Sequence, residues 1–473
     1  MRLPAFILLS LMALAAQGKV TPMSLIGDNM VLKQNSQPRL SGTAAPGSDI
    51  TVDVSWNDTS YSAKTDASGN WTVRIDTPQG SFEPQTITIS DGEPLTINNV
   101  RIGEVWLASG QSNMQMPLKG FGGCCTQGGF DEIARSGAYA DKVSFYMVPL
   151  TQSYTPVEHL DSKWDIPSPE TSPEFSALAW HYAKRMSDVL GVPVGIVNAA
   201  YGGARVESWT PRDILETYAD VSLDPADIEP MTHYLRPLLM YNAMFYPVKD
   251  YGYSGIIWYQ GCSNVGAHDT YADRLAKMIT RWRKDIGEGD IPFYAVEIAP
   301  YEYDVNNPDV APLLRKAQWD AVAMVPNADM ISTNDLIEPF ERFNIHPSRK
   351  AEAGKRLCDL ALHKTYGKTQ FPAQSPRYKG HRVEDGAVWI ALETGPDGIC
   401  RNYDIQGFEV AGDDKVFHPA DSVWLHWQTN EIVASSKEVP EPVAVRYCWK
   451  DFQSGTLYSG NYLPLIPFRS DDW

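Results

Sequence analysis

The residue best suited to chemistry is Ser112, which lies where an apolar run breaks into small and polar residues. Residues 104–108 have the composition of a buried strand, and residues 109–113 (Ser-Gly-Gln-Ser-Asn) follow directly. A strand that ends in Gly-x-Ser holds a serine hydroxyl at the carboxyl edge of a sheet, where open α/β sheets bind ligands. We therefore predict that Ser112 is a nucleophile. For Gly-x-Ser alone, the alternative is a serine that caps the next helix.

Three further stretches follow predicted strands and carry complementary groups. They are 198–209 with a Gly-Gly pair, 258–264 with an asparagine, and 344–347 with a histidine. Serine hydrolysis needs a nucleophile, a base, and N–H donors directed at the developing oxyanion. Because the carboxyl ends of parallel strands meet at one edge of a sheet, we expect these stretches to converge with Ser112.

Strand and helix patterns alternate between about residues 101 and 367. Helix 271–286, for example, carries apolar residues at i, i+3, i+4 and i+7. The pattern predicts an α/β fold with a parallel sheet and helices on both faces. The expected strands are 101–108, 194–199, 254–259, 293–298 and 329–333, and the expected helices are 174–190, 271–286, 311–324 and 348–365. The long irregular stretch after Ser112, with Cys124 and Cys125, is typical of a lid or substrate wall.

The flanking regions have a different pattern. Residues 19–100 contain short alternating strands separated by turn residues, which predicts a small β-sandwich domain, and residues 368–473 return to β patterns. Residues 1–18 combine one basic residue, a short apolar run and a small-x-small end, which indicates a signal peptide cleaved near Gly18. We therefore expect a secreted or periplasmic protein, and no later segment is long and apolar enough to span a membrane.

The composition narrows the classes of ligand. A formal net charge of −18 argues against nucleic acid and anionic membranes as partners, because both require basic surface. The sequence has no zinc-binding cysteine pair, Walker loop or dinucleotide fingerprint, so we expect no metal and no cofactor. Six cysteines are present, and export permits disulfides, but their spacing does not dictate a pairing.

The motifs together resemble the SGNH (GDSL-like) hydrolases, and most closely the sialate O-acetylesterase-like carbohydrate esterases. The resemblance rests on residues 105–114, 191–198, 202–209, 239–244, 257–264 and 345–347, and it extends to 28–32, 443–447 and 467–470. It implies an SGNH-type, flavodoxin-like sheet in residues 101–367, flanked by the two all-β domains. It also implies hydrolysis of O-acetyl esters on a glycan, with O-acetylated sialic acid as the leading substrate.

The same resemblance implies roles for individual residues. Ser112 matches the nucleophile and His346 the general base. The oxyanion hole would combine the Ser112 N–H, a backbone N–H of Gly202 or preferably Gly203, and the Asn264 amide. Candidate substrate-binding residues are Gln111, Asn113, Gln260 and Arg205. Arg205 could bind a sugar carboxylate, and the alternative is an ion pair with Glu207.

The chain departs from the family pattern near the base and in the third stretch. Phe343 stands where related triads place an aspartate, and Asn344 precedes Ile-His-Pro where many relatives have aspartate. Asp335 is therefore our candidate for the third triad member; Glu338, Glu341, Asn344 and a backbone carbonyl are the alternatives. Cys262 replaces a glutamate, Tyr201 replaces a tryptophan, and a disulfide between Cys262 and the cysteines of the irregular stretch is an open alternative.

Two rival functions stay open. The first keeps the chemistry and changes the substrate, giving an acetyl-xylan or other polysaccharide esterase. The second is a non-catalytic carbohydrate-binding protein on a degenerate esterase scaffold, suggested by Phe343, Asn344 and Cys262.

Overall fold

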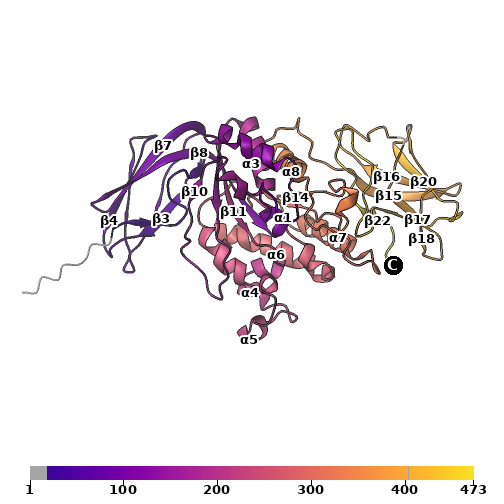
Figure 1. The fold of residues 1–473 in the computed structure, drawn as a ribbon, viewed down its shortest axis with the longest axis horizontal. Helices are drawn as coiled ribbons and strands as arrows, with labels where there is room; N and C mark the ends of the chain where they lie inside the picture. The colour runs from indigo at the N-terminus through magenta and orange to yellow at the C-terminus, as the bar shows by residue number, and fades with distance from the viewer. Residues whose placement is uncertain (1–18, 403) are drawn as a thin grey trace, which may run out of the picture.

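The centre of the molecule is a sheet with the strand order β10-β9-β11-β8-β12-β13-β14 (Figure 1). The computed structural model describes residues 19–402 and 404–473, so the predicted signal peptide lies outside the described residues. The strands of this sheet are β8 (Pro94–Gly110), β9 (Val143–Met147), β10 (Trp164–Asp165), β11 (Val194–Ala200), β12 (Gly255–Tyr259), β13 (Phe293–Val296) and β14 (Ala328–Ile331). Neighbours are parallel except at the β10–β9 edge. The five strands predicted from sequence are all present, and β9 and β10 are additional.

Helices cover both faces of this sheet. α3 (Ala177–Leu190) and α8 (Lys350–Lys364) lie on one face, and α6 (His268–Ile286) and α7 (Val310–Ala323) on the other (Figure 1). Alternate residues of β8 divide between the two cores, with Trp106 and Ala108 toward α3 and α8, and Val105 and Leu107 in the other core. The predicted α/β fold is thus confirmed. The short helices are α1 (Ser112–Gln115), α2 (Gly129–Arg135), α4 (Arg212–Leu215) and α5 (Pro225–Ile228).

The three central strands end at the same level. In the register of the sheet, Gly110 of β8 pairs with Ala200 of β11 and with Tyr259 of β12. The turns that follow these strands therefore start from neighbouring points. This is the convergence on which the sequence prediction depended.

The N-terminal β region contains a separate three-stranded sheet and further strands that extend the central sheet. Its strands are β1 (Thr21–Pro22), β2 (Val31–Lys33), β3 (Arg39–Thr43), β4 (Asp49–Val54), β5 (Ser60–Lys64), β6 (Asn70–Arg74) and β7 (Ser81–Ser90). β8 pairs with β7 and β2 in its first part and with β11 and β12 in its last part. One strand therefore connects the two regions, and it crosses the predicted domain boundary near residue 100.

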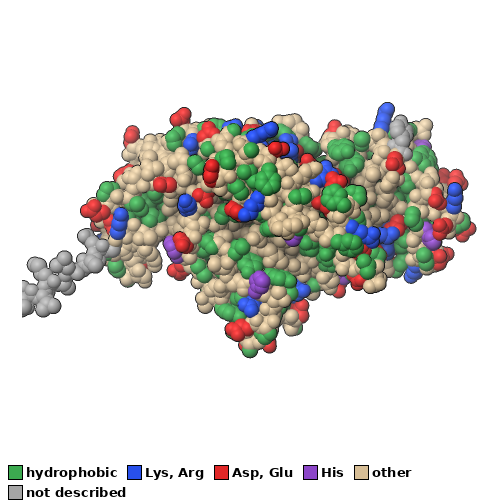
Figure 2. Space-filling view, in the orientation of Figure 1, with side chains coloured by type: hydrophobic (Ala, Val, Ile, Leu, Met, Phe, Trp, Pro, Cys, Tyr) green, Lys and Arg blue, Asp and Glu red, His purple; other side chains and the backbone are tan. Residues whose placement is uncertain are grey.

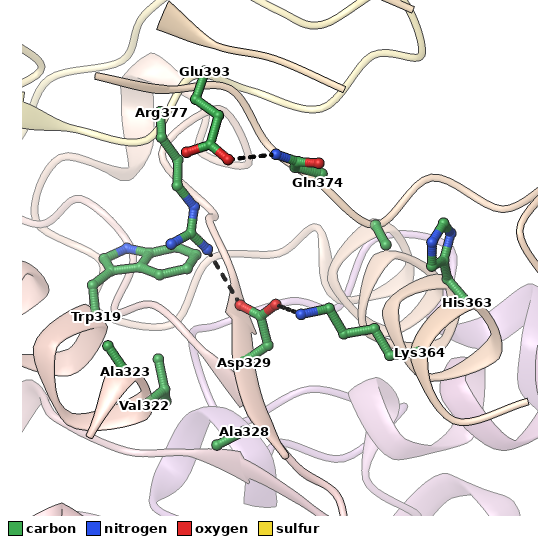
Figure 3. A pocket seen from close by; sticks show the side chains of 11 residues that line it. Trp319, Val322, Ala323, Ala328, Asp329, His363, Lys364, Gln374, Arg377 and Glu393 are labelled. Carbon is green, nitrogen blue, oxygen red and sulfur yellow. Dashed lines mark hydrogen bonds and ion pairs between the residues drawn. The ribbon is translucent and has the colours of Figure 1, made fainter. Parts of the chain in front are cut away.

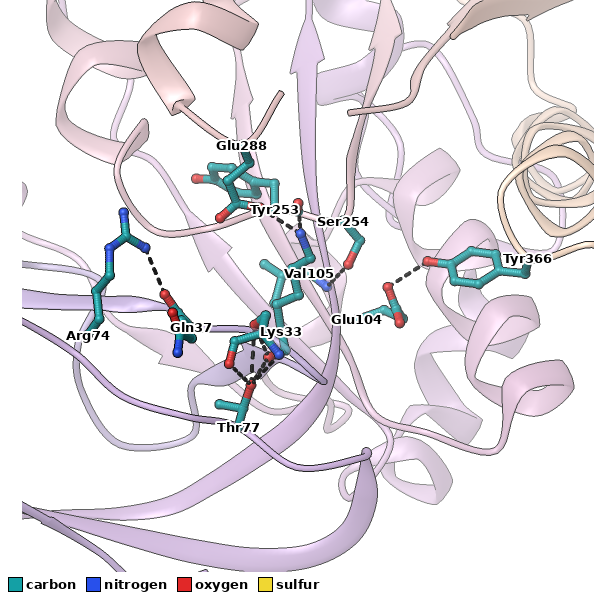
Figure 4. Close-up of polar contacts among 11 residues, drawn as sticks. Lys33, Gln37, Arg74, Thr77, Glu104, Val105, Tyr253, Ser254, Glu288 and Tyr366 are labelled. Carbon is teal, nitrogen blue, oxygen red and sulfur yellow. Dashed lines mark hydrogen bonds and ion pairs between the residues drawn. The ribbon is translucent and has the colours of Figure 1, made fainter. Parts of the chain in front are cut away.

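Polar contacts reinforce this junction (Figure 4). The Lys33 ammonium donates to the Tyr253 carbonyl at 3.0 Å and to the Glu288 carboxylate at 2.6 Å. The Tyr366 hydroxyl donates to Glu104 at 2.6 Å. Side chains far apart in the sequence thus hold the base of β8, the strand that leads to Ser112.

The C-terminal β region contains two four-stranded sheets, β15-β16-β20-β19 and β18-β17-β21-β22. The strands are β15 (Arg377–Glu384), β16 (Ala387–Glu393), β17 (Phe408–Ala411), β18 (Phe417–Pro419), β19 (Ser422–His426), β20 (Glu431–Ser435), β21 (Ala444–Tyr447) and β22 (Phe468–Arg469). The buried Asp451 carboxylate accepts hydrogen bonds from the backbone of Tyr303, Asp304 and Ala311, and Arg315 donates to the Asp451 carbonyl. These bonds attach the region to the segment around α7.

A cavity of about 330 Å³ lies at this second junction (Figure 3). Its polar groups bind one another: Asp329 pairs with Lys364 and Arg377, and the Arg377 guanidinium lies 4.6 Å from the centre of the Trp319 ring. The cavity contains none of the residues predicted to act in chemistry, and its paired charges indicate a structural joint.

The surface agrees with the acidic composition. On the face shown in Figure 2, basic side chains are scattered among acidic ones and do not form a continuous patch. Within the described part of the chain, no helix has both the length and the apolar character needed to cross a membrane.

Candidate active site

Ser112 lies in a sharp turn at the end of β8. The turn requires Gly110, which has φ +133°, and a Cβ at this position would lie 2.3 Å from the Tyr259 carbonyl oxygen. Ser112 is the first residue of α1, whose N-cap is Gln111 and has no side-chain capping bond. The serine hydroxyl therefore does not cap the helix. It is half-buried, and none of the hydrogen bonds described for residues 19–402 and 404–473 involves it.

Two glutamines fasten the neighbouring turns to this one. The Gln111 side chain accepts a hydrogen bond from the Gly261 N–H at 2.7 Å, which fixes the turn after β12. The Gln115 side chain accepts one from the Gly202 N–H at 2.8 Å, which fixes the turn after β11. Gln111 thus differs from the expectation of substrate contact, because its amide oxygen is directed into the protein.

The Gly-Gly turn separates two backbone donors. The Gly202 N–H is bonded to Gln115, whereas no described residue accepts a hydrogen bond from the Gly203 N–H. Gly203 has φ +76°, a conformation that favours glycine, and a Cβ on it would lie 2.5 Å from the ring of Tyr234. Position 203 therefore needs glycine for both its conformation and its close packing.

Asn264 is held in a single orientation. It is 1% exposed, and its oxygen accepts hydrogen bonds from the Gln260 side chain at 2.7 Å and from the Val206 N–H at 3.1 Å. Its nitrogen donates to Glu207 at 3.0 Å, which uses one of its two N–H groups. Gln260 also donates to the Ala204 carbonyl and is fully buried, so its side chain supports Asn264 and the turn after β11.

Arg205 and Glu207 have different partners. Glu207 forms a buried ion pair with Arg274, so the alternative of an Arg205–Glu207 pair is not what the structure contains. The Arg205 Nε donates to the Ser263 carbonyl at 2.9 Å. Its two terminal guanidinium nitrogens have no partner among the described residues.

His346 lies on the irregular segment 332–349 between β14 and α8. Its Nδ1 is 3.8 Å from the Cys124 sulfur, and the ring of Phe121 meets the imidazole edge-on with centres 5.2 Å apart. The side chain of Asn344 accepts from both the His346 N–H at 3.0 Å and the Cys124 thiol at 3.3 Å. Burial, and next the charge of Lys350, lower the pKa of His346 to about 4. The imidazole is therefore neutral near pH 7, as a general base requires.

The carboxylates considered as partners of His346 have other contacts. Both Asp335 oxygens accept from Arg356, at 2.9 and 3.0 Å. The Glu341 carboxylate accepts hydrogen bonds from the backbone N–H groups of Ser348 and Glu338. Among the described residues, none of the carboxylates of Asp335, Glu338 and Glu341 is hydrogen-bonded to His346. The third-member role expected of Asp335 therefore has no contact to support it, because its carboxylate is fully used by Arg356. Phe343, at the family's aspartate position, is 68% exposed.

Lys350, which is 1% exposed at the start of α8, was not predicted from the sequence as part of the site. Its ammonium donates to the Asn113 side-chain oxygen at 2.6 Å, and the Asn113 nitrogen donates to the Ile345 carbonyl at 3.0 Å. Asn113 was expected to bind substrate, but its amide is used within the protein. The available signal was a lysine four residues after His346 in the first turn of a helix, where a positive charge is unfavourable.

All six cysteines carry free thiols. Cys262 is buried, with its sulfur 4.0 Å from the Asn113 nitrogen, and Cys124 contacts His346. The disulfide between Cys262 and the cysteines of the irregular stretch, an alternative in the sequence analysis, is therefore not formed in this structure.

A cavity of about 490 Å³ opens beside the nucleophile turn. It shares Gln115 and Phe121 with the site, and the ends of β9 and β11 contribute Met147, Asn198 and Ala200. Its wall also includes Lys119 and Glu174, which form an ion pair with each other. The mixture of apolar and polar walls suits a sugar-sized ligand.

A parallel sheet with a serine turn, a Gly-Gly turn, a buried asparagine and a histidine at its carboxyl edge defines the class of SGNH-type hydrolases. The family model described as carbohydrate esterase, sialic acid-specific acetylesterase, matches residues 102–363, and the chain belongs to this family. It is therefore a carbohydrate esterase, a hydrolase of carboxylic esters.

Individual relatives agree with this family. The chain is 26% identical to sialate O-acetylesterase of Mus musculus over 94% of its own length and 93% of the relative's. It is 27% identical to sialate O-acetylesterase of Homo sapiens, over 75% and 72% of the two lengths. Among solved structures, a carbohydrate acetylesterase from Xanthomonas citri superimposes with a TM-score of 0.84 at 29% identity, covering 96% of this chain and all of that one.

Proposed function

We propose that this protein removes O-acetyl groups from sialic acids, with Ser112 as nucleophile and His346 as general base. The observation that carries the proposal is the hydrogen bond from the Asn113 amide to the Ile345 carbonyl, at 3.0 Å. Asn113 follows Ser112 and Ile345 precedes His346, so this bond brings the segments of the two residues together at the edge of the sheet.

The mechanism proceeds through an acetyl-enzyme. His346 accepts the Ser112 proton as the hydroxyl attacks the acetyl carbonyl, and the sugar hydroxyl leaves with that proton. Water, activated by the same imidazole, then releases acetate and regenerates Ser112. The oxyanion is stabilised by the N–H groups of Ser112 and Gly203 and by the second N–H of Asn264. In support, none of these three groups has an acceptor among the described residues.

Cys124 and Asn344 take the place of a triad carboxylate in this proposal. The thiol lies at Nδ1 of His346, and Asn344 holds both the thiol and the backbone of the histidine. A triad carboxylate fixes the tautomer of the imidazole and stabilises the imidazolium. A thiol hydrogen-bonded to Asn344 contributes to the first role and little to the second, so we expect the same reaction at a lower rate.

We propose that Arg205 binds the sialate carboxylate. Its terminal nitrogens are available for the paired hydrogen bonds that a guanidinium makes to a carboxylate. A neutral polysaccharide such as acetyl-xylan is the second candidate substrate. It is favoured by the cavity beside Ser112, where the charge of Lys119 is already matched by Glu174.

We also propose that the chain is exported with cleavage near Gly18, and that residues 19–100, 101–367 and 368–473 form its three domains, with β8 running from the first into the second. The amino-terminal sequence of the protein recovered from its native source checks the first point. A start at residue 19 is the expected result.

The test measures acetate release from O-acetylated sialosides and from acetylated xylan by the wild type and by Ser112→Ala. We expect the sialoside to be the better substrate, and Ser112→Ala to lose activity by on the order of 10⁴-fold or more with an unchanged unfolding temperature. Arg205→Met should lower kcat/KM on the sialoside more than on xylan. Wild-type activity in Ser112→Ala contradicts the mechanism, and a preference for xylan contradicts the substrate.

A further inference from the structure

Lys350 occupies a position that is unfavourable for a lysine in two ways. It is 1% exposed, so its ammonium group is removed from water, and it is the first residue of α8, where the helix dipole repels positive charge. Burial lowers the pKa of Lys350 to about 7. No carboxylate in the described part of the chain forms an ion pair with it. A lysine at such a position is a candidate for a role other than stabilising the fold.

The contacts of Lys350 lead to both reacting residues. Its ammonium donates to the Asn113 oxygen at 2.6 Å, which leaves the Asn113 nitrogen facing the Ile345 carbonyl at 3.0 Å. Because an ammonium can only donate and a carbonyl can only accept, the Asn113 amide has one consistent orientation. Lys350, Asn113 and Ile345 therefore form a chain of hydrogen bonds between the turn of Ser112 and the segment of His346.

The charge of Lys350 also acts on His346 directly. After burial, it is the second cause of the low pKa of His346. The other groups that face the imidazole are the Phe121 ring and the Cys124 thiol from the segment after α1, and the Asn344 amide from its own segment.

Besides His346 and Tyr259, whose ring centre lies 5.8 Å from the Lys350 nitrogen, the ionisable groups near the ammonium are two thiols and one acid. They are Cys262 from the turn after β12, Cys124 from the segment after α1, and Glu341 from the segment before α8. Both oxygens of Glu341 are already bonded to backbone N–H groups. The ammonium thus lies beside the site without a matched counter-charge.

We propose that Lys350 is a positioning residue for ester hydrolysis: through the Asn113 amide it fixes the nucleophile turn against the segment of His346, and its positive charge disfavours protonation of the imidazole. The proposal rests on the proposed function, since it assumes that Ser112 and His346 react. It explains why an asparagine directly after the nucleophile is buried and directed away from the cavity.

The first experiment compares Lys350→Met, Lys350→Arg and the control Lys355→Met, which replaces an exposed lysine of the same helix. For Lys350→Met we expect kcat to fall on the order of 10²-fold with KM changed by less than about threefold, because the loss is one of alignment. The unfolding temperature should not fall, since an unmatched buried charge is removed. Lys350→Arg should recover part of kcat, and Lys355→Met should match the wild type.

The second readout is the pH profile. The base form of His346 is the neutral one, so activity is lost as pH falls through its pKa of about 4. Removing the positive charge of Lys350 makes protonation easier, so the acid limb of kcat should move to higher pH in Lys350→Met. It should stay in place in Lys350→Arg and in Asn113→Ala, which breaks the hydrogen-bond chain and keeps the charge.

Two results overturn the positioning role. One is wild-type kcat with an unmoved acid limb in Lys350→Met. The other is a loss of kcat that follows a loss of unfolding temperature and is not recovered by arginine, which describes a structural lysine. Ser112→Ala, measured alongside, separates this from failure of the proposed function. If Ser112→Ala is inactive while Lys350→Met behaves like the wild type, only the positioning role fails; an active Ser112→Ala removes both.

Discussion

The nucleophile half of the site, formed by the turns after β8, β11 and β12, is held by bonds between turns that begin at the same level of one sheet. Gln111 illustrates this, because its N–H donates to the Tyr259 carbonyl and its side chain receives the Gly261 N–H. The base half, residues 332–349, is bonded to a strand end at its start, where Ser332 and Thr333 donate to Glu297 directly after β13, but the part around His346 is not. Its contacts come from distant segments, through Cys124, Asn113 and the Leu465 carbonyl, which accepts from Asn334.

This difference in support has consequences for substitution. A turn fixed at the end of a strand has one geometry, so removing its reactive group should abolish the chemistry without altering the fold. In a segment held by several side chains, the loss of activity should differ from one substitution to the next, according to the contact that each removes. We therefore expect graded changes in kcat to come mainly from substitutions in the base half.

The largest effect is expected at the centre of the base half. His346→Gln should lower kcat by on the order of 10⁴-fold on p-nitrophenyl acetate, because it removes the proton acceptor for Ser112. Steady-state kinetics with a thermal unfolding curve would measure this. A reduction smaller than about tenfold in a folded protein would mean that another group is the base.

Asp335→Asn should affect stability while leaving the chemistry intact. The Asp335 and Arg356 side chains are only 4% and 10% exposed, and the substitution leaves the Arg356 charge unmatched. Breaking a buried ion pair costs about 3 kcal/mol, which a denaturant titration would detect. At 25 °C we expect kcat within about twofold of wild type. If kcat instead falls on the order of 10²-fold without loss of stability, Asp335 does act on His346.

The smallest effect is expected from the contact between Cys124 and His346. Cys124→Ala removes the thiol at Nδ1 of His346, a weak hydrogen bond worth ~1 kcal/mol, so kcat should fall about fivefold. Cys125→Ala is the matched control, since Cys125 is adjacent and exposed. Equal kcat values for the two variants would show that the thiol does not orient the imidazole.

Much of the fold was predictable because its signals are local. The apolar strands and the face of α6 follow from residue periodicity. The order of the motifs along the chain matches the family's and led us to propose Ser112, the Gly-Gly turn, Asn264 and His346 as one set. β9 was missed because it is a short strand within the long stretch after Ser112 that we interpreted as irregular. The continuity of β8 through residue 100 was missed because pattern changes mark composition and do not show where a strand ends.

The sequence by itself determined the fold class, since this depends on short-range patterns of burial and turn formation, and through the family resemblance it named the residues that we propose for the site. Only the tertiary structure decided which groups surround them. Asp335 binds Arg356, Asn113 binds Lys350, and Cys124 faces His346, over separations of 21, 237 and 222 residues. The partner of a side chain depends on how distant segments pack. The identity of a charged residue or a cysteine in the sequence does not specify which residue it will contact.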